Sequence, residues 1–397
     1  MFMQDFDKII SRENTNSVKY DLRSLYFGNK EVIPMWVADM DFETPSFIQE
    51  AVKKRAQHPI YGYSIKPKSY FDSIINWMEK RHQWKVKREH IAFSPGVVPG
   101  LVLALMTFSK PGDKIVVQSP VYFPFFSSVL DNGRQLVVNE LLEKDNYYTI
   151  DFVDLEKKLK DTKTKVLLIS NPHNPVGRVW KQEELEKMVA LCLKYEVLLF
   201  SDDIHADLIF DGYKHRVAAN ISPEAKQICI SFMAPSKTFN MAGLSTSFVI
   251  IQDDNKRKAF ENTIEAYHLG LGNLFGTVAL EAAYEEGEEW LGELMSYLKK
   301  NTELVADFLK KNIPQITFAK PEATYLLWLN CKSLQLNDKD LASFFVNKAR
   351  LGLNNGSVFG AGGAGYMRMN IACPTSVVRK ALMQLQKVVE ENNLLSK

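Results

Sequence analysis

The sequence predicts an α/β protein with a large doubly wound domain, built on a mostly parallel sheet, and a second, smaller α+β unit. Apolar runs of strand length alternate with helical segments over about 150 residues, which is typical of doubly wound domains. Several of these runs are apolar at both odd and even positions, as expected for strands buried on both faces of a parallel sheet. A length of 397 residues, against roughly 150 per domain, also favours more than one domain.

The first 45 residues read as irregular, and a helix follows Pro45. A long apolar helix is expected over 97–108, directly after Pro95-Gly96. Three strand–helix pairs come next, which we expect at 114–118 with 123–131, at 135–139 with a helix from about 154, and at 165–170 with 181–196. Further strands are expected at 197–201, 227–232 and 247–251.

A helical region over 255–312 then leads away from the predicted sheet. The remaining elements are expected as strands at 316–320, 325–329 and 366–371 and helices at 338–349 and 376–392. We therefore expect a large domain over 46–290. The smaller one would combine 1–45 with 291–397.

Composition excludes several classes of function. Hydrophobic residues (46%) and charged residues (24%) are present in the proportions of an ordinary folded domain. With 49 basic and 47 acidic side chains the net charge is +2, so no global field favours nucleic acid or an anionic membrane. The N-terminal stretch contains acids and reads as no signal peptide, and no apolar run reaches the ~18 residues of a membrane span. Four widely spaced cysteines, without a CxxC pair, favour free thiols in the cytoplasm.

Three polar residues follow successive apolar runs. Asn174 comes after 165–170, Asp202 after 197–201 and Lys237 after 227–232. Each residue has another interpretation when it is taken alone. Asn174 could simply form a turn, Asp202 could bind a metal together with His205, and Lys237 could extend to the surface. We expect no metal, because no second cluster of histidine and acidic residues is evident to complete a site.

Taken together, the three residues predict a cofactor site. Ligands of an open parallel sheet bind at the carboxyl ends of its strands, so these side chains should converge. Asparagine, aspartate and lysine are the groups that pyridoxal 5'-phosphate (PLP) needs: a partner for its phenolate oxygen, one for its pyridinium nitrogen and an amine for its aldehyde.

The motifs NPHNPVGR, SDDIH and SKTFN resemble those of fold-type I PLP-dependent enzymes, the aminotransferase class I/II superfamily, in order and spacing. The resemblance extends over nearly the whole chain and implies the fold of aspartate aminotransferase. It also implies the roles of further residues. Cofactor contacts are expected from Lys237, Asp202, Asn174, Tyr122, Val97, Val98, Ser236, Tyr61 and His205.

Within that set, Tyr122 would stack on the cofactor ring, and Val97 and Val98 would offer backbone N–H groups to its phosphate. Tyr61 would reach the phosphate of a partner subunit, which implies a homodimer with active sites at the subunit interface. His205 would support Asp202. For the substrate, the resemblance implies that Arg368 clamps the α-carboxylate.

Two departures from the common aminotransferase pattern are informative: His205 stands where most have tyrosine, and Ser245 where many have arginine. Together with the run PMWVADMDF over 34–42, which contains Trp36, Val37 and Asp39, they resemble the MalY/PatB-type cystathionine β-lyases. Trp36, Val37 and Tyr122 are therefore expected to bind substrate together with Arg368.

The resemblance to this branch implies a C–S β-lyase. Such an enzyme releases a thiol, pyruvate and ammonia from L-cystathionine or related cysteine S-conjugates, in amino-acid metabolism and methionine biosynthesis. Lys237 would be the catalytic base, and its amine would also carry the cofactor. Two alternatives stay open: an aminotransferase of the same fold, because the same residues serve both outcomes, and a PLP-bound regulatory protein with vestigial activity.

Overall fold

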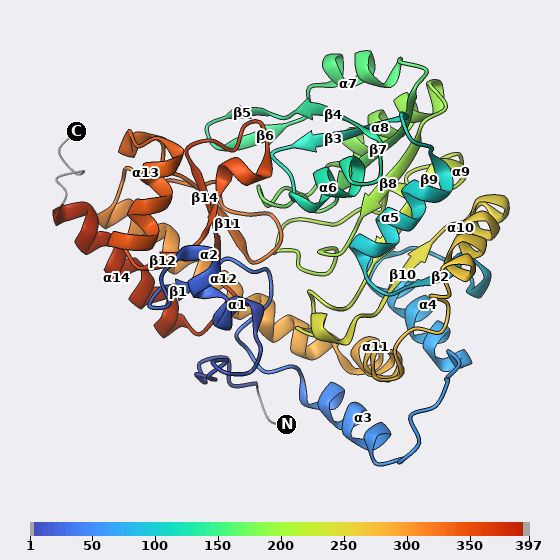
Figure 1. Cartoon of the computed structure of the whole chain (residues 1–397), viewed down its shortest axis with the longest axis horizontal. Coiled ribbons are helices and arrows are strands. Elements are labelled where there is room, and N and C mark those ends of the chain that lie inside the picture. Colours follow the sequence, from blue (N-terminus) through green and yellow to red (C-terminus); the bar gives the residue numbers. More distant parts are fainter. Residues whose placement is uncertain (1–3, 392–397) are drawn as a thin grey trace.

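The computed structural model describes residues 4–391 and is organised around one large sheet. Its seven strands lie in the order β2-β10-β9-β8-β7-β3-β4 (Figure 1). Their bounds are β2 (Ile91–Ser94), β3 (Lys114–Ser119), β4 (Gln135–Glu140), β7 (Thr164–Ser170), β8 (Leu198–Asp202), β9 (Cys229–Met233) and β10 (Ser247–Ile250). The pairs from β9 to β4 are parallel, whereas β10 runs antiparallel to both β9 and β2. The predicted mostly parallel sheet is confirmed.

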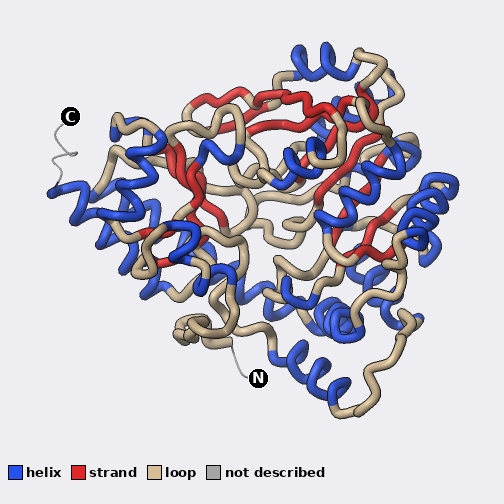
Figure 2. Tube along the Cα trace, in the orientation of Figure 1, coloured by secondary structure: helices blue, strands red, loops and turns tan. Residues whose placement is uncertain are grey.

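Helices surround this sheet (Figure 2). They are α3 (Ser46–Ala56), α4 (Lys68–His82), α5 (Val97–Phe108), α6 (Pro124–Leu130), α7 (Phe152–Leu159), α8 (Gln182–Lys194), α9 (Ala225–Ile228), α10 (Asp254–Ala266) and α11 (Leu274–Glu286). One buried cluster joins Val116 and Leu167 of the strands to α8 and α11, and another joins Val117 and Leu168 to α5 and α10. Neighbouring strand residues thus enter opposite cores, which explains why these strands carry apolar residues at both odd and even positions.

A smaller unit contains the three-stranded sheet β11-β14-β13. Its elements are α12 (Glu288–Asn312), β11 (Leu326–Asn330), α13 (Asp338–Ser343), a π-helical turn (Phe344–Lys348), β13 (Asn354–Asn355), β14 (Tyr366–Asn370) and α14 (Thr375–Glu391). The N-terminal segment, with α1 (Val18–Asp21) and α2 (Arg23–Phe27), packs onto it, because β1 (Ile33–Pro34) pairs in parallel with β12 (Leu351–Gly352). The exact division into domains at residues 46 and 290 stays a prediction.

Sequence patterns misjudged some elements. The strand predicted at 316–320 is wrong, because only a single bridge between Thr317 and Asn330 forms there before Pro321. The patterns also missed α4, β2 and the hairpin of β5 (Leu142–Lys144) and β6 (Tyr147–Thr149). The last helix is predicted to end at residue 392. The structure describes α14 as far as Glu391, and residue 392 lies outside the described residues.

No helix within residues 4–391 is both long enough and apolar enough to cross a membrane.

A buried ion pair joins the loop after β7 to the segment before β11. The Arg178 guanidinium contacts Glu322 (Nε to Oε2, 3.2 Å) and Glu184 (Nη2 to Oε2, 2.8 Å). The same Glu322 oxygen accepts the backbone N–H of Val179 at 2.7 Å, and the Glu322 N–H donates to the carbonyl of Gly177. Since Arg178 and Glu322 are both buried, loss of the Glu322 carboxylate leaves the Val179 N–H without its acceptor and leaves Arg178 paired with Glu184.

The Glu322→Ala variant should therefore unfold at a lower urea concentration, with a loss of about 2 kcal/mol in the free energy of unfolding, because buried donors lose their acceptor. The matched control is Glu79→Ala, which removes a surface carboxylate 3.8 Å from Lys85 and should change stability by less than about 1 kcal/mol. Equal losses in the two variants would contradict this role of Glu322.

Candidate active site

The carboxyl ends of β7, β8 and β9 meet at a cavity of about 310 Å³, which we call the active-site cavity. These strands are neighbours in the sheet, and Asn174, Asp202 and Lys237 follow or end them. All three side chains line the cavity, together with Tyr122 and the start of α5. The convergence predicted from the sequence is confirmed.

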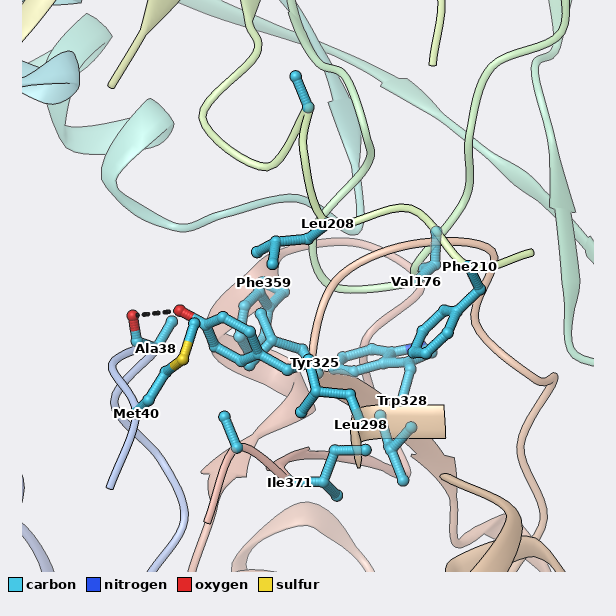
Figure 3. Close-up of a cluster of buried hydrophobic side chains, with 14 of the residues drawn as sticks. Ala38, Met40, Val176, Leu208, Phe210, Leu298, Tyr325, Trp328, Phe359 and Ile371 are labelled. Atoms are coloured by element: carbon cyan, nitrogen blue, oxygen red, sulfur yellow. Dashed lines mark hydrogen bonds between the residues drawn. The ribbon is translucent and has the colours of Figure 1, made fainter. Parts of the chain in front are cut away.

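Lys237 is held by a backbone carbonyl from a distant segment. Its Nζ donates a hydrogen bond of 2.6 Å to the carbonyl of Ala38. The same carbonyl accepts the Tyr325 hydroxyl at 3.0 Å, and Figure 3 shows this second hydrogen bond. Burial lowers the pKa of Lys237 to about 8, although the nearby negative charge of Asp39 opposes the shift. Ser236 precedes Lys237 and also lines the cavity.

The pKa of Asp202 is shifted in the opposite direction to that of Lys237, and burial is again the cause. Burial raises its pKa to about 7, even though the N–H of Ile204 donates to its Oδ1 at 3.1 Å. A cation in the cavity would keep this carboxylate ionised. Its neighbour Asp203 does not line the cavity, since its carboxylate accepts hydrogen bonds from Asn171 and Ser201. Among residues 4–391, no group of three or more histidine, cysteine or acidic side chains could hold a metal ion.

His205 lines the same cavity as an uncharged imidazole. Burial lowers its pKa to about 3, and the charges of Lys237 and Arg368 act in the same direction. Its Nδ1 is buried and has no hydrogen-bond partner within the described part of the chain. The ring lies edge-on to that of Tyr325, with centroids 6.1 Å apart. A buried polar atom without a partner at a cavity wall is a candidate ligand contact.

Arg368, on β14, connects three other segments of the chain. Its Nη1 donates to Asn174 Oδ1 at 3.0 Å, and its Nη2 donates to the Trp36 carbonyl and to Asn354 Oδ1, both at 2.8 Å. Its Nε is buried and has no hydrogen-bond partner among residues 4–391. Burial lowers the pKa of the guanidinium to about 10, so it stays positive at neutral pH. Arg368 thus retains a donor for an anionic ligand beside the active-site cavity.

Trp36 and Val37 take part through their backbone. Their carbonyls accept hydrogen bonds from Arg368 and from Asn370 Nδ2, respectively. The indole of Trp36 turns away: its Nε1 donates to the carbonyl of Lys19, and its ring packs on Tyr26 at 4.4 Å. Neither side chain is part of the active-site cavity wall. The sequence indicated the right segment but gave no signal for Ala38 or Tyr325.

The remaining predicted residues divide into two groups. Tyr122 lines the cavity, and so do Val97 and Val98 in the first turn of α5. The N–H groups of a first helical turn have no acceptor within the helix, so this end of α5 suits an anion. Tyr61 lies elsewhere on the single chain. Its side chain is exposed, and its hydroxyl donates to the carbonyl of Ala56 at 2.8 Å.

Comparison with known proteins places the chain in a family. Residues 30–385 match the family model for aminotransferase class I and II, and the chain belongs to that family. It is 44% identical to cystathionine beta-lyase PatB from Bacillus subtilis over 382 residues, which cover 96% of this chain and 99% of PatB. It is 29% identical to protein MalY from Escherichia coli, with 96% and 98% of the two chains covered.

Solved structures agree with this assignment. Cystalysin from Treponema denticola, whose crystal structure contains a PLP cofactor, superposes with a TM-score of 0.96 and 39% identity, covering 98% of this chain and 100% of cystalysin. The PLP-bound C–S lyase from Staphylococcus hominis gives a TM-score of 0.91 at 35% identity, with 98% of each chain covered. The resemblance predicted from the motifs is confirmed.

The pKa of Lys237 predicts how its amine reacts in the ligand-free protein. With a pKa of about 8, the amine is about one tenth neutral at pH 7 and about nine tenths neutral at pH 9. Peptide mapping after brief acylation at pH 6–10 should therefore give a half-maximal rate for Lys237 near pH 8. In Asp39→Asn the midpoint should move lower, because the charge that raises this pKa is gone. A midpoint above pH 10 would contradict the effect of burial.

Proposed function

We propose that this chain is a PLP-dependent C–S β-lyase of the cystathionine β-lyase type, which converts L-cystathionine or related cysteine S-conjugates to a thiol, pyruvate and ammonia. The observation that carries the proposal is the convergence of Asn174, Asp202 and Lys237 on one cavity. The similarity to PatB and to two PLP-containing lyase structures supports it.

The residues of the cavity fit PLP group by group. Lys237 offers an amine to the aldehyde, and Asp202 offers a carboxylate to the pyridine nitrogen. Asn174 uses its side-chain oxygen on Arg368, which leaves its amide N–H groups for the phenolate oxygen. For the phosphate there are the first turn of α5, with Val97 and Val98, and hydroxyl groups such as that of Ser236. Tyr122 supplies an aromatic ring for stacking.

When bound, PLP supplies an electron sink next to the Cα atom of an amino-acid substrate. In our proposal Arg368 binds the substrate carboxylate and orients the Cα–H bond. Lys237, whose pKa of about 8 leaves part of the amine neutral at physiological pH, accepts the Cα proton as general base. Asp202, ionised beside a cationic ring nitrogen, holds the proton on that nitrogen, and the neutral His205 supports it at the same wall of the cavity.

Ser245 makes the phosphate end of the site less positive than an arginine would. It lines the cavity and contributes a hydroxyl without a charge. A second chain could supply a further contact, because Tyr61 sits in a segment of strongly exposed apolar side chains, including Tyr63 at 97% and Ile65 at 83%. We therefore propose a homodimer in which Tyr61 of each chain reaches the phosphate in the other.

The cytoplasm is the proposed location. Cys192, Cys229, Cys331 and Cys373 are all buried free thiols, which suits a reducing compartment. Cleavage of L-cystathionine there would release homocysteine, and we extend the proposal to methionine biosynthesis on that basis.

The decisive test is incubation of the purified protein with L-cystathionine alone. We expect pyruvate and homocysteine in equal amounts, and a loss of at least about 10²-fold in turnover for Lys237→Ala. Lys226→Ala, which alters an exposed lysine outside the cavity, is the matched control and should keep full activity.

Three outcomes would count against the proposal. Turnover that needs a keto-acid co-substrate would favour an aminotransferase. Normal turnover in Lys237→Ala would refute the site itself. A Lys237→Ala protein that still fulfils the cellular role would favour a regulatory protein.

The dimer predicts a specific effect of the Tyr61 hydroxyl. Tyr61→Phe keeps the ring but loses a hydrogen bond to a charged group, so PLP should bind about 10-fold more weakly while the dimer mass in sedimentation stays unchanged. Tyr213→Phe, at another exposed tyrosine, is the control and should bind PLP normally. A monomeric protein with full PLP affinity would contradict the proposed role of Tyr61.

A further inference from the structure

A buried carboxylate outside the active-site cavity lies next to the turn that carries Lys237. Asp207 belongs to the segment after β8 and is buried. It is not part of the active-site cavity wall, and none of the steps proposed for the reaction involves it. An acid in the interior stays charged only when it is paired or hydrogen-bonded, so the partners of Asp207 indicate what it does.

The two carboxylate oxygens of Asp207 contact different segments. Oδ2 accepts the hydroxyl of Thr238 at 3.1 Å. Oδ1 accepts the indole N–H of Trp77 at 3.0 Å and lies 3.0 Å from Nε2 of His82, and both of these residues belong to α4. Asp207 therefore joins α4 to the residue that directly follows Lys237.

Asp207 is ionised at neutral pH. Burial by itself would raise the pKa of its carboxyl group, but contacts with His82, Arg81 and Trp77 lower this pKa below its usual value. Thr238 is also fully buried, so its hydroxyl donates to a charged acceptor where water does not compete. Such a hydrogen bond is stronger than one between neutral groups and holds the Thr238 side chain in one position.

The same hydrogen bond connects the two loops that carry cofactor groups. Asp202 and Asp207 lie in one short segment, which is closed by backbone hydrogen bonds of its turns. Thr238, on the other side, is covalently linked to Lys237. The contact between Asp207 and Thr238 thus constrains the separation of the Asp202 carboxylate from the Lys237 amine. That separation has to match PLP, whose ring nitrogen and aldehyde lie at opposite ends of the ring.

Trp77 fixes the same turn from a second side. Its ring packs edge-on against Phe239, with centroids 5.9 Å apart, and stacks on Tyr284 with centroids 4.9 Å apart. Because Asp207 accepts the indole N–H, the carboxylate also orients this ring. Both residues that follow Lys237 are therefore held through Asp207 and Trp77, one by a hydrogen bond and the other by aromatic packing.

We propose that Asp207 is a positioning residue for the lyase reaction: through Thr238 it holds the Lys237 amine where it can carry the cofactor and accept the Cα proton. This inference rests on the proposed function and adds two residues to its machinery. Neither Asp207 nor Thr238 lines the active-site cavity, so their loss removes no reacting group. It changes the position of one, and a displacement of about 1 Å can lower a rate by about 10²-fold.

Thr238→Val tests this link with a small change in shape, because a methyl group replaces the hydroxyl. The first readout is the rate at which ligand-free protein attaches PLP, a step that joins the Lys237 nitrogen to the aldehyde carbon and releases one water. Visible absorbance follows the rate, and borohydride reduction with peptide mapping verifies the site. We expect Thr238→Val to lower the rate about 10-fold, and Thr238→Ser, which keeps the hydroxyl, to stay within about twofold.

Steady-state kinetics of the holoenzyme with L-cystathionine give a second readout. Proton transfer from Cα depends on the position of the Lys237 amine, so kcat should fall about 10-fold in Thr238→Val. Arg368, which binds the substrate carboxylate in our proposal, is unchanged, so KM should change by less than about twofold. A loss of folded protein alone would lower the amount of active enzyme and leave the PLP attachment rate of the folded fraction unchanged.

A double variant tests whether the two residues act together. Asp207→Ala removes the acceptor, so adding Thr238→Val to it should slow PLP attachment no further. Independent, additive losses would contradict the link between Asp207 and Thr238. If Asp207→Ala does not fold, the comparison of Thr238→Val with Thr238→Ser decides the question.

The matched control is Thr302→Val in α12. The Thr302 hydroxyl is buried and donates to the carbonyl of Leu298 at 2.9 Å, outside the active-site cavity wall. This variant should lose similar stability in urea and attach PLP at the normal rate. Normal attachment and kcat in Thr238→Val, or equal losses in Thr302→Val, would overturn the positioning role alone. A parent protein that does not attach PLP at Lys237 would overturn the proposed function instead.

Discussion

The hydrogen bonds of one buried guanidinium hold the active site together. Arg368 lies on a strand of the small sheet, yet its three acceptors come from the loop after β7, from the N-terminal segment and from β13. Burial of a charge is unfavourable unless its donors are satisfied, so the folded chain must bring these segments to the same place. The position of the N-terminal segment beside the active-site cavity follows from this constraint.

The electrostatics of the cavity have one dominant cause. Burial raises the pKa of Asp202 and lowers those of Lys237, His205 and Arg368. Desolvation moves acids and bases in opposite directions, toward their neutral forms. The site therefore combines a reactive amine with the carboxylate of Asp202, whose raised pKa reflects burial. A ligand with a protonated ring nitrogen and an aldehyde would satisfy both. This is why the match between cavity and cofactor can be argued from the protein alone.

Sequence reasoning succeeded where topology determines position. Asn174, Asp202 and Lys237 could be brought together from the sequence because the ends of adjacent parallel strands meet. It failed where the functional group belongs to the backbone. The carbonyl of Ala38 carries no residue signature, and Trp36, which is expected to bind substrate, meets Arg368 through its carbonyl.

Two further limits have the same physical origin. A strand needs a partner in register, and the apolar run at 316–320 finds only one bridge, so composition alone misassigned it. Tyr61 is exposed on the single chain, and its proposed role joins residues of two copies, which no strand pattern within one chain encodes.

The run over 34–42, which distinguishes this chain from common aminotransferases, acts mainly by fixing carbonyl groups. Arg12 pairs with Asp39 at 2.6 Å and with Asp41 at 2.9 Å, and the buried Lys19 pairs with Asp41 at 3.0 Å. Asn370 donates to the carbonyls of Val37 and Asp39 from the other side. Because desolvation offsets much of the attraction in buried ion pairs, such a cluster contributes more to a defined geometry than to net stability. The acids of the run therefore act on Lys237 in two ways. The charge of Asp39 raises its pKa directly, and the ion pairs of Asp39 and Asp41 hold the segment whose Ala38 carbonyl accepts a hydrogen bond from the amine.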